Sequence, residues 1–134
     1  MIAAGEDPRF IARRLIICAA EDVGNADPNA FNIAVNAYKA VELTGLPEGR
    51  IPLAMAVIYV ARAPKSNETV MAIDEALADI EQGKDFPPPM HLRDSHYKDA
   101  KKYGFGEGYI YSHAAPDVEQ QFLPDELVGK KYTK

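Results

Sequence analysis

Apolar side chains recur at helical spacing in the first part of the chain, and two Asp-Pro pairs mark helix starts. In Asp7-Pro8 and in Asp27-Pro28, the aspartate can accept hydrogen bonds from the free backbone amides at a helix start. The proline that follows is suited to the first helical position. Glycines predict the two ends, at Gly24 and at Gly45 with Pro47 just beyond. The predicted inner faces carry Ile11, Leu15, Cys18 and Ala19 on the first helix, and Ile33, Ala34, Ala37 and Val41 on the second.

The segment 51–63, IPLAMAVIYVARA, is apolar on nearly every side. A short apolar run is compatible with a buried strand or a buried helix. Its alanines and its helical neighbours favour a central helix surrounded on all sides, with Pro52 in the first turn.

A fourth helix is predicted from a cap at Ser66 or Asn67 to a stop at Gly83. One face is apolar and the other is acidic, and the acidic face is most simply exposed to water. The apolar positions are Val70, Ile73, Leu77 and Ile80, and the acidic ones are Asp74, Glu75, Asp79 and Glu81. Four helices with short connections predict an all-α fold, an antiparallel helical bundle.

The pattern changes after residue 84. Three prolines at 87–89 favour extended backbone, one short helix is predicted near 95–103, and the remainder reads as turns and extended pieces rich in tyrosine. We therefore expect a helical core over 1–84 and a tail over 85–134 that packs on the core or on a neighbouring subunit.

Composition narrows the function classes. The chain has 134 residues and a net charge of −5, which disfavours a dedicated DNA clamp. Its single cysteine, Cys18, excludes an intrachain disulfide, and its longest apolar run is too short to cross a bilayer. With no secretory signal pattern at the N-terminus, we expect a soluble cytoplasmic protein and no membrane partner.

The stretch GFGEGYIYSH at 104–113 raises the question of a nucleotide loop. Phosphate loops follow a strand and lead into a helix, whereas Gly104 follows a predicted helix and Gly108 precedes β-like residues. The GxxxxGK[ST] signature is absent from the sequence. The order favours a structural role, with Gly104 as a helix stop.

The sequence gives little support for a catalytic site or a metal site. His91 and His96 lack the helical i, i+4 spacing of metal ligands, and Cys18 falls on a predicted apolar face where an inert thiol is the norm. We expect no catalytic, cofactor-binding or metal-binding residues.

Lysines beside tyrosines in the tail leave a second possibility open. HYKDAKKY and GKKYTK place positive charge next to aromatic rings, a combination that binds single-stranded nucleic acid. Ordinary surface lysines with packed tyrosine rings are the simpler interpretation. The candidates for nucleic-acid contact are Arg93, Lys98, Lys101, Lys102, Lys130 and Lys131.

Six ordered strings resemble the C-terminal portion of the RarA/MgsA family of AAA+ ATPases, which includes relatives of the Werner-helicase-interacting protein. They are GEDPRFIARRL (5–15), EDVGNADPNA (21–30), YVARAPKSN (59–67), PPPMHLRD (87–94), YGFGEGYIYSH (103–113) and QQFLPDELVGKKY (120–132).

The resemblance implies a non-catalytic oligomerisation or scaffold region of an ATPase of replication-fork maintenance and recombination, similar in role to a clamp-loader collar. It implies a homo-oligomer, with a tetramer favoured, a nucleoid-associated cytoplasmic location, and single-stranded DNA and replication proteins as further partners. ATP and magnesium would belong to an N-terminal module that this sequence lacks.

Residues that match the family strings are candidates for subunit contacts or tail docking. These are Pro64, Lys65, Ser66, Asn67, His91, Leu92, Arg93, Tyr109, Tyr111, His113, Leu123 and Pro124. The LPDE string also includes Asp125 and Glu126, and the glycine string includes Gly104, Gly106 and Gly108.

Overall fold

The computed structural model describes residues 1–82 and 86–133, with the side chain of Lys101 also left out. These residues contain four α-helices and six short turns of 3-10 or π helix, and no strand. The all-α prediction is confirmed. The α-helices are α1 (Pro8–Cys18), α2 (Pro28–Thr44), α3 (Arg50–Arg62) and α4 (Glu68–Glu81). The shorter turns are η1 (Ile2–Ala4), η2 (Ala19–Val23), η3 (Gly24–Ala26), η4 (Met90–Leu92), η5 (Ala100–Tyr103) and η6 (Asp125–Leu127).

The chain divides into two compact units. The helical unit comprises Met1–Ala76 with the residues from Tyr132 onward, and the turn-rich unit comprises Leu77–Lys131. Helix α4 contributes residues to both. The predicted boundary at 84/85 and the predicted stop at Gly83 lie outside the described residues, so both stay predictions.

The two Asp-Pro starts form as the sequence predicts. The Asp7 carboxylate accepts from the Arg9 amide at 2.8 Å, and the Asp27 carboxylate accepts from the Asn29 amide at 3.1 Å. Helix α1 continues into one π turn, η2, which ends at Gly24 with φ +50°. Helix α2 ends at Gly45. Because an accepting carboxylate and a proline coincide at each start, the beginnings of α1 and α2 are set locally.

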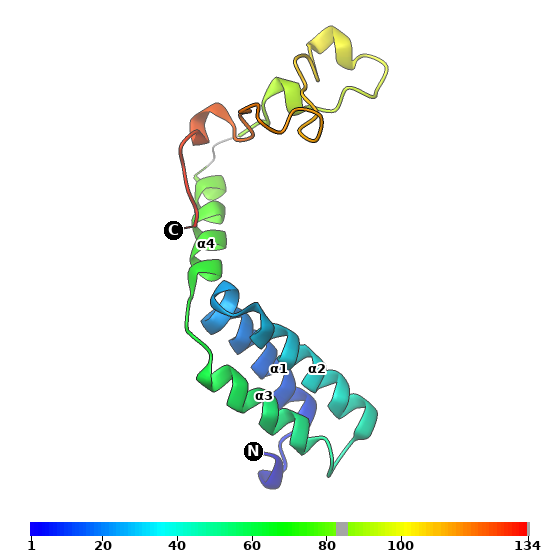
Figure 1. Ribbon diagram of the computed structural model, residues 1–134, viewed down its shortest axis with the longest axis vertical. Helices are drawn as coiled ribbons and strands as arrows, with labels where there is room; N and C mark the ends of the chain where they lie inside the picture. Colours follow the sequence, from blue (N-terminus) through cyan, green and yellow to red (C-terminus); the bar gives the residue numbers. More distant parts are fainter. Residues whose placement is uncertain (83–85, 134) are drawn as a thin grey trace. The chain divides into compact units, whose positions relative to one another are not determined.

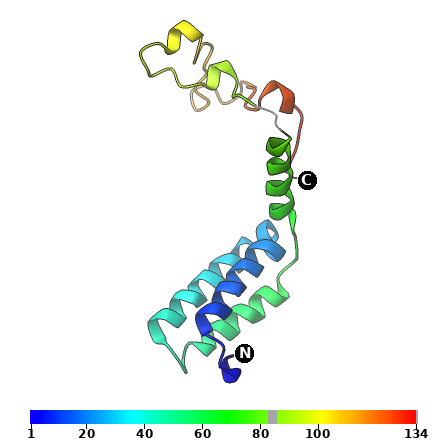
Figure 2. The ribbon, with the colours of Figure 1, turned by 180° about the vertical axis from the view of Figure 1, so that it is seen from behind.

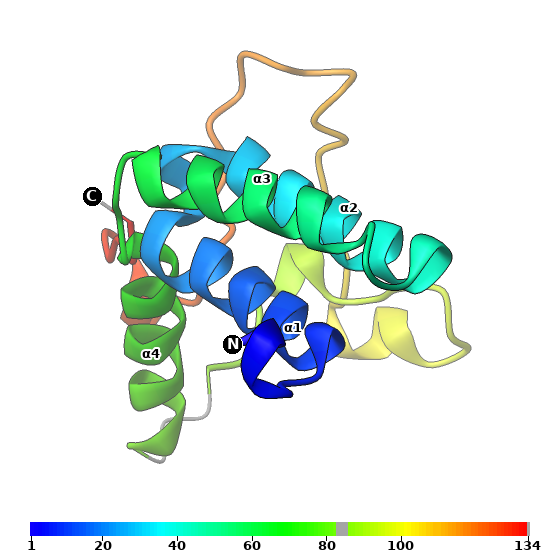
Figure 3. The same ribbon diagram turned by 90° about the horizontal axis from the view of Figure 1, so that it is seen from below.

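Helices α1, α2 and α3 lie side by side and alternate in direction (Figure 1), and the view from behind shows the same order (Figure 2). Seen from below, the three helices lie lengthwise against one another (Figure 3). The predicted antiparallel packing is therefore present in this part of the molecule.

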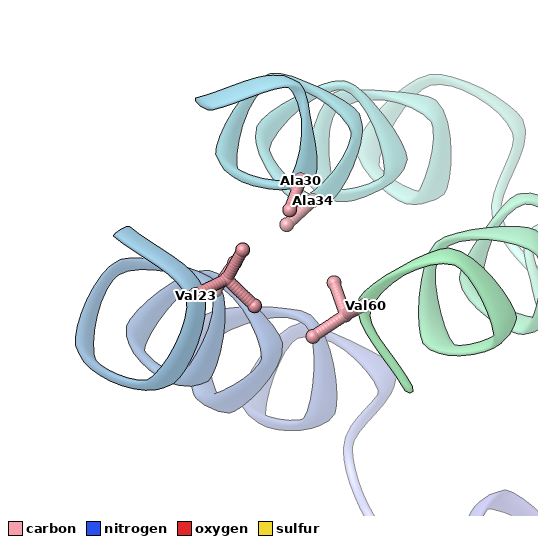
Figure 4. Packing of buried hydrophobic residues seen from close by; sticks show 5 residues of the cluster. Val23, Ala30, Ala34 and Val60 are labelled. Atoms are coloured by element: carbon pink, nitrogen blue, oxygen red, sulfur yellow. The ribbon is translucent and has the colours of Figure 1, made fainter. Parts of the chain in front are cut away.

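Small side chains form the core of the helical unit. One cluster joins Val23, Ala30, Ala34 and Val60, which point toward one another from three helical segments (Figure 4). A second joins Ala12, Val41 and Leu53. Alanine lets helix backbones approach closely, but each alanine removes little apolar area from water. The largest fully buried side chain is Val23.

Helix α3 differs from its prediction. It is a helix, with Pro52 in its first turn, but it is not surrounded on all sides. Leu53, Ala56 and Val60 are buried, while Ile51, Met55 and Ile58 are 65%, 61% and 52% exposed. Helices α1 and α2 pack against one side of α3, and the opposite, largely apolar side is left exposed.

Candidate subunit interface and its supporting turns

The exposed side of α3 forms an apolar stripe. Ile51, Met55 and Ile58 follow one another at i, i+4 and i+7, so they share one face of the helix. Arg62 continues the same line four residues after Ile58. The far end of the stripe borders a cavity of about 420 Å³ lined in part by Met55, Ile58, Arg62 and Pro64. A contiguous exposed apolar face of this kind is typical of protein–protein contact.

The turn 64–67 fixes the end of α3. The Lys65 ammonium donates to the carbonyls of Val60 and Ala63, at 2.6 and 2.7 Å. These carbonyls have no partner within the helix, and a cation favours the negative end of the helix dipole. The backbone amide of Ser66 donates to the Asp22 carbonyl at 2.9 Å. Lys65 and Ser66, two of the predicted contact residues, are thus engaged within the chain.

The same turn starts α4. The Ser66 hydroxyl accepts from the Glu68 amide at 3.2 Å, as a helix cap does. A Cβ added at Gly24 would lie 2.9 Å from the Thr69 hydroxyl, so the first turn of α4 lies close to the Asp22–Gly24 corner. The turn therefore sets where α4 begins in the helical unit.

A second cavity, about 460 Å³, lies beside this turn and includes Cys18, Asp22 and Asn67. The Cys18 thiol donates to the Asp22 carboxylate at 3.1 Å. This hydrogen bond and burial raise the pKa of the Cys18 thiol, so the protonated form is favoured. A protonated thiol is a poor nucleophile, in keeping with the inert cysteine expected from the sequence.

In the turn-rich unit, the HLR string (91–93) and the glycine string (104–108) pack against each other. The Arg93 guanidinium donates to the Pro88 carbonyl at 2.8 Å and lies 5.2 Å above the Phe105 ring. The Gly106 amide donates to the Met90 carbonyl at 2.9 Å. His91 and Leu92 belong to η4 in this corner and are half-buried. Two sequence motifs that lie apart in the chain thus form one structural corner.

Three amides of the glycine string, 104–108, donate within the protein. The three glycines of this string have φ of +70° to +79°, which glycine adopts readily. The amides of Phe105, Gly106 and Glu107 donate to backbone carbonyls of the protein. Since these donors are already used, the structure agrees with the structural role predicted for this stretch. The predicted helix before it is shorter than expected and consists of η5.

The remaining candidates of the glycine and LPDE strings lie at the surface. Tyr109 and Tyr111 are each 58% exposed, and the Tyr111 ring lies 5.3 Å from the His113 ring. The β-like residues 109–111 form no strand. Leu123 lines a cavity of about 440 Å³, and Pro124 directly precedes η6. No contact among the described residues assigns these side chains to a docking role, which stays a prediction.

Two of the candidate lysines are paired with acidic side chains. Lys102 pairs with Asp99 at 2.9 Å, and Lys130 pairs with Asp79. Lys98 and Lys131 are exposed, and the side chain of Lys101 lies outside the described residues. Two of the four described lysines in this set are therefore paired with carboxylates.

Asp79 was expected on the solvated face of α4, and this is wrong. It is 8% exposed and paired with Lys130, fifty-one positions later in the chain. A buried carboxylate requires a partner, and the sequence distance between the two hides the pair from any local pattern. Its neighbours Asp74, Glu75 and Glu81 are exposed as predicted.

The histidines have separate surroundings. The His96 amide and ring both contact the Asp94 carboxylate, and the backbone hydrogen bond is the main cause that lowers the pKa of Asp94. Over the residues described, no three histidine, cysteine or acidic side chains lie close enough to hold a metal ion. No helix in the same residues is long and apolar enough to cross a bilayer.

Comparisons with known proteins match the whole chain. The family model described as "MgsA AAA+ ATPase C terminal" matches residues 1–134. The chain is 51% identical to replication-associated recombination protein A of Bacillus subtilis, covering 100% of this chain and 32% of that protein. It is 52% identical to an AAA domain-containing protein of Mycobacterium tuberculosis, covering 98% and 30%. It is 35% identical to the ATPase WRNIP1 of Dictyostelium discoideum, covering 98% and 15%.

The chain spans about a third or less of the length of these relatives. The match over 1–134 agrees with the resemblance carried by the six strings. The chain therefore belongs to the C-terminal region of the MgsA/RarA family of AAA+ ATPases.

Proposed function

We propose that this chain is the self-association region of an AAA+ ATPase of replication-associated recombination, that it works as a scaffold, and that it carries no catalytic activity of its own. The observation that supports this most is the apolar stripe of α3, Ile51, Met55 and Ile58, which is more than half exposed on a helix otherwise built for burial. Covering it with another subunit removes apolar area from water, which favours association.

The thin core of the helical unit gives further support. Its buried side chains are mostly alanines, so the chain gains less from internal burial than a leucine-rich bundle does. Association supplies additional burial and stabilises the folded chain by mass action. We infer a homo-oligomer, with four copies favoured by the family relationship.

ATP and magnesium would then bind in the part of the longer relatives that this chain does not match. The chain contains no GxxxxGK[ST] sequence, and the amides of its glycine string are used internally. We place the assembled protein in the nucleoid-associated cytoplasm, where a recombination ATPase meets stalled forks and replication proteins.

Light scattering of purified chains tests the proposal. Ile58→Glu places a charge in the centre of the stripe and should lower the average mass to that of a monomer. Leu43→Glu, at a side chain 86% exposed on α2, is the matched control and should keep the wild-type mass. A wild-type chain that is monomeric at every concentration would refute self-association.

Single-stranded DNA binding is a second candidate. It is supported by the Tyr97 and Tyr103 rings, 47% and 63% exposed, next to the exposed Lys98. Labelled oligonucleotide should then bind at low salt and be released as salt rises, with Lys98→Glu weakening binding and Lys39→Glu leaving it unchanged. Absence of binding at low salt would remove this candidate.

A further inference from the structure

The two exposed helix faces of this chain carry opposite charge. Helix α3 contains Arg50 and Arg62 and no acidic residue, whereas all five charged residues of α4 are acidic. Arg50 and Arg62 are exposed, and within the part of the chain that the structure describes neither forms an ion pair. Asp74 and Glu81 are exposed on α4. The two helices are therefore electrostatically complementary.

Their apolar stripes also correspond. On α4, Ile73, Leu77 and Ile80 follow at i, i+4 and i+7, the spacing of Ile51, Met55 and Ile58 on α3. The α4 side chains are 55%, 48% and 62% exposed. Each stripe extends over eight residues, about 10 Å of helix. Asp74 and Glu81 lie beside the α4 stripe on one side, seven residues apart, and Arg62 continues the α3 stripe.

The connection between α3 and α4 leaves the α3 stripe open in the helical unit. Lys65 and Ser66 hold the turn at the end of α3 and at Asp22, and Thr69 lies close to Gly24. The first turn of α4 is thus held at the Asp22–Gly24 corner, while Ile51, Met55 and Ile58 remain exposed. Within the helical unit the α3 stripe is therefore uncovered.

We propose that the α4 stripe of a second copy docks on the α3 stripe of the first, with Asp74 and Glu81 of that copy facing the arginines at the ends of α3. Pairing α3 with α3, or α4 with α4, brings like charges together, which disfavours both self-pairings. The contact joins two different surfaces, so either a two-fold pair with two such contacts or a closed ring uses every stripe. This inference rests on the proposed self-association and specifies its contact.

Two charge-reversed chains test the pairing. Arg50→Glu with Arg62→Glu reverses α3, and Asp74→Lys with Glu81→Lys reverses α4. Each variant alone should lose assembly, with the dissociation constant raised about tenfold or more, because every α3–α4 contact then joins like charges. Matched controls reverse exposed charges elsewhere, Arg13→Glu with Lys39→Glu and Glu42→Lys with Glu48→Lys. They should assemble as wild type, and circular dichroism should show unchanged helix content in all chains.

An equimolar mixture gives the decisive result. Each α3–α4 contact between the two different variants joins opposite charges, so light scattering should show the wild-type mass restored with the two chains in equal amounts. An α4-reversed chain that assembles like wild type, or a mixture that stays dissociated, would overturn the pairing while self-association stands. A monomeric wild-type chain would instead refute the proposed function on which the pairing rests.

Discussion

The helical unit and the turn-rich unit are stabilised in different ways. In the first, α1, α2 and α3 bury clustered apolar side chains, from Ala12 to Val60. In the second, the buried side chains among the described residues are Ala100 and Asp79, and the chain is held by backbone turns, aromatic contacts, one cation–π contact and ion pairs. A region with a hydrophobic core unfolds cooperatively, whereas a region held by isolated polar contacts can open locally. Substitutions should therefore act globally in the first unit and locally in the second.

The largest effect is expected in the core of the helical unit. Leu53→Ala removes a side chain that is 3% exposed and leaves a cavity, which should lower the free energy of unfolding by about 2–5 kcal/mol. Leu43→Ala, at an exposed position of α2, should change it by less than about 0.5 kcal/mol. Chemical denaturation monitored by circular dichroism measures both. Equal effects would show that α3 is not packed as described.

A smaller, local effect is expected at the ion pair of the turn-rich unit. Lys130→Met leaves the Asp79 carboxylate buried without its partner ammonium, which should cost about 1–3 kcal/mol of local stability. Hydrogen exchange should accelerate around η6 and in the last turn of α4, with little change in α1 and α2. The neighbouring Lys131→Met is the control and should exchange as wild type. A global loss of stability in Lys130→Met would contradict the comparison between the units.

Substitution of two glycines in the turn-rich unit separates the effect of close packing from the effect of backbone strain. Gly106 has φ +76°, and a Cβ there would lie 2.7 Å from the Cβ of Ser95. Gly108 has φ +79° and nothing within 4 Å of such an atom. Both Gly→Ala changes carry a left-handed backbone cost, about 1–2 kcal/mol. Gly106→Ala should open the corner around Arg93 further, seen as faster exchange and loss of Phe105 ring-current shifts. Identical spectra for the two variants would argue against the close approach.

The end of α3 should be sensitive to Lys65. Lys65→Met removes a cation from the last carbonyls of the helix, which should lower the free energy of unfolding by about 1 kcal/mol. Lys39→Met, at an exposed site on α2, serves as the matched control. Thermal unfolding compares the two. A wild-type midpoint for Lys65→Met would mean that the turn does not depend on this ammonium.

The smallest effect concerns pH and the first cap. The side-chain hydrogen bond from Arg9, with that from its amide, lowers the pKa of Asp7 below the ordinary 3.8. A lowered folded-state pKa means that the stabilisation is present above the unfolded pKa and lost as pH falls through the folded one. Asp7→Asn should therefore weaken the acid dependence of thermal unfolding and leave its neutral and alkaline dependence unchanged. An unfolding midpoint of Asp7→Asn that falls with acid pH as in the wild type would show that the Asp7 cap does not contribute to this stability.

The sequence predicted local features better than distant ones. The starts of α1 and α2 follow from Asp-Pro pairs, and their ends follow from Gly24 and Gly45, because each signal acts on neighbouring backbone groups. The exposed side of α3 was not predicted, because composition shows that a helix is apolar but not how many neighbours cover it. Arginines at both ends of that helix, at 50 and 62, were the available signal that its ends reach solvent.

Contacts between residues far apart in the chain were also not predicted from the sequence. The pairing of Asp79 with Lys130 and the packing of Met90 against Gly106 depend on how turns fold, which periodicity does not specify. For the candidate interface, Pro64 borders the open stripe, but the stripe itself was assigned to the core. The family resemblance led us to propose self-association, and the exposed side chains of α3 led us to propose where it occurs.

Radical footprinting of the wild-type chain at high and low concentration tests the central claim most directly. Met55 and Ile58 are 61% and 52% exposed in one chain, and association through the α3 stripe would cover them. We predict that both are protected at high concentration and become reactive on dilution, while Met1 and Leu43 react equally at both. Equal reactivity of Met55 and Ile58 at all concentrations, in a chain that is oligomeric by mass, would show that α3 is not the interface.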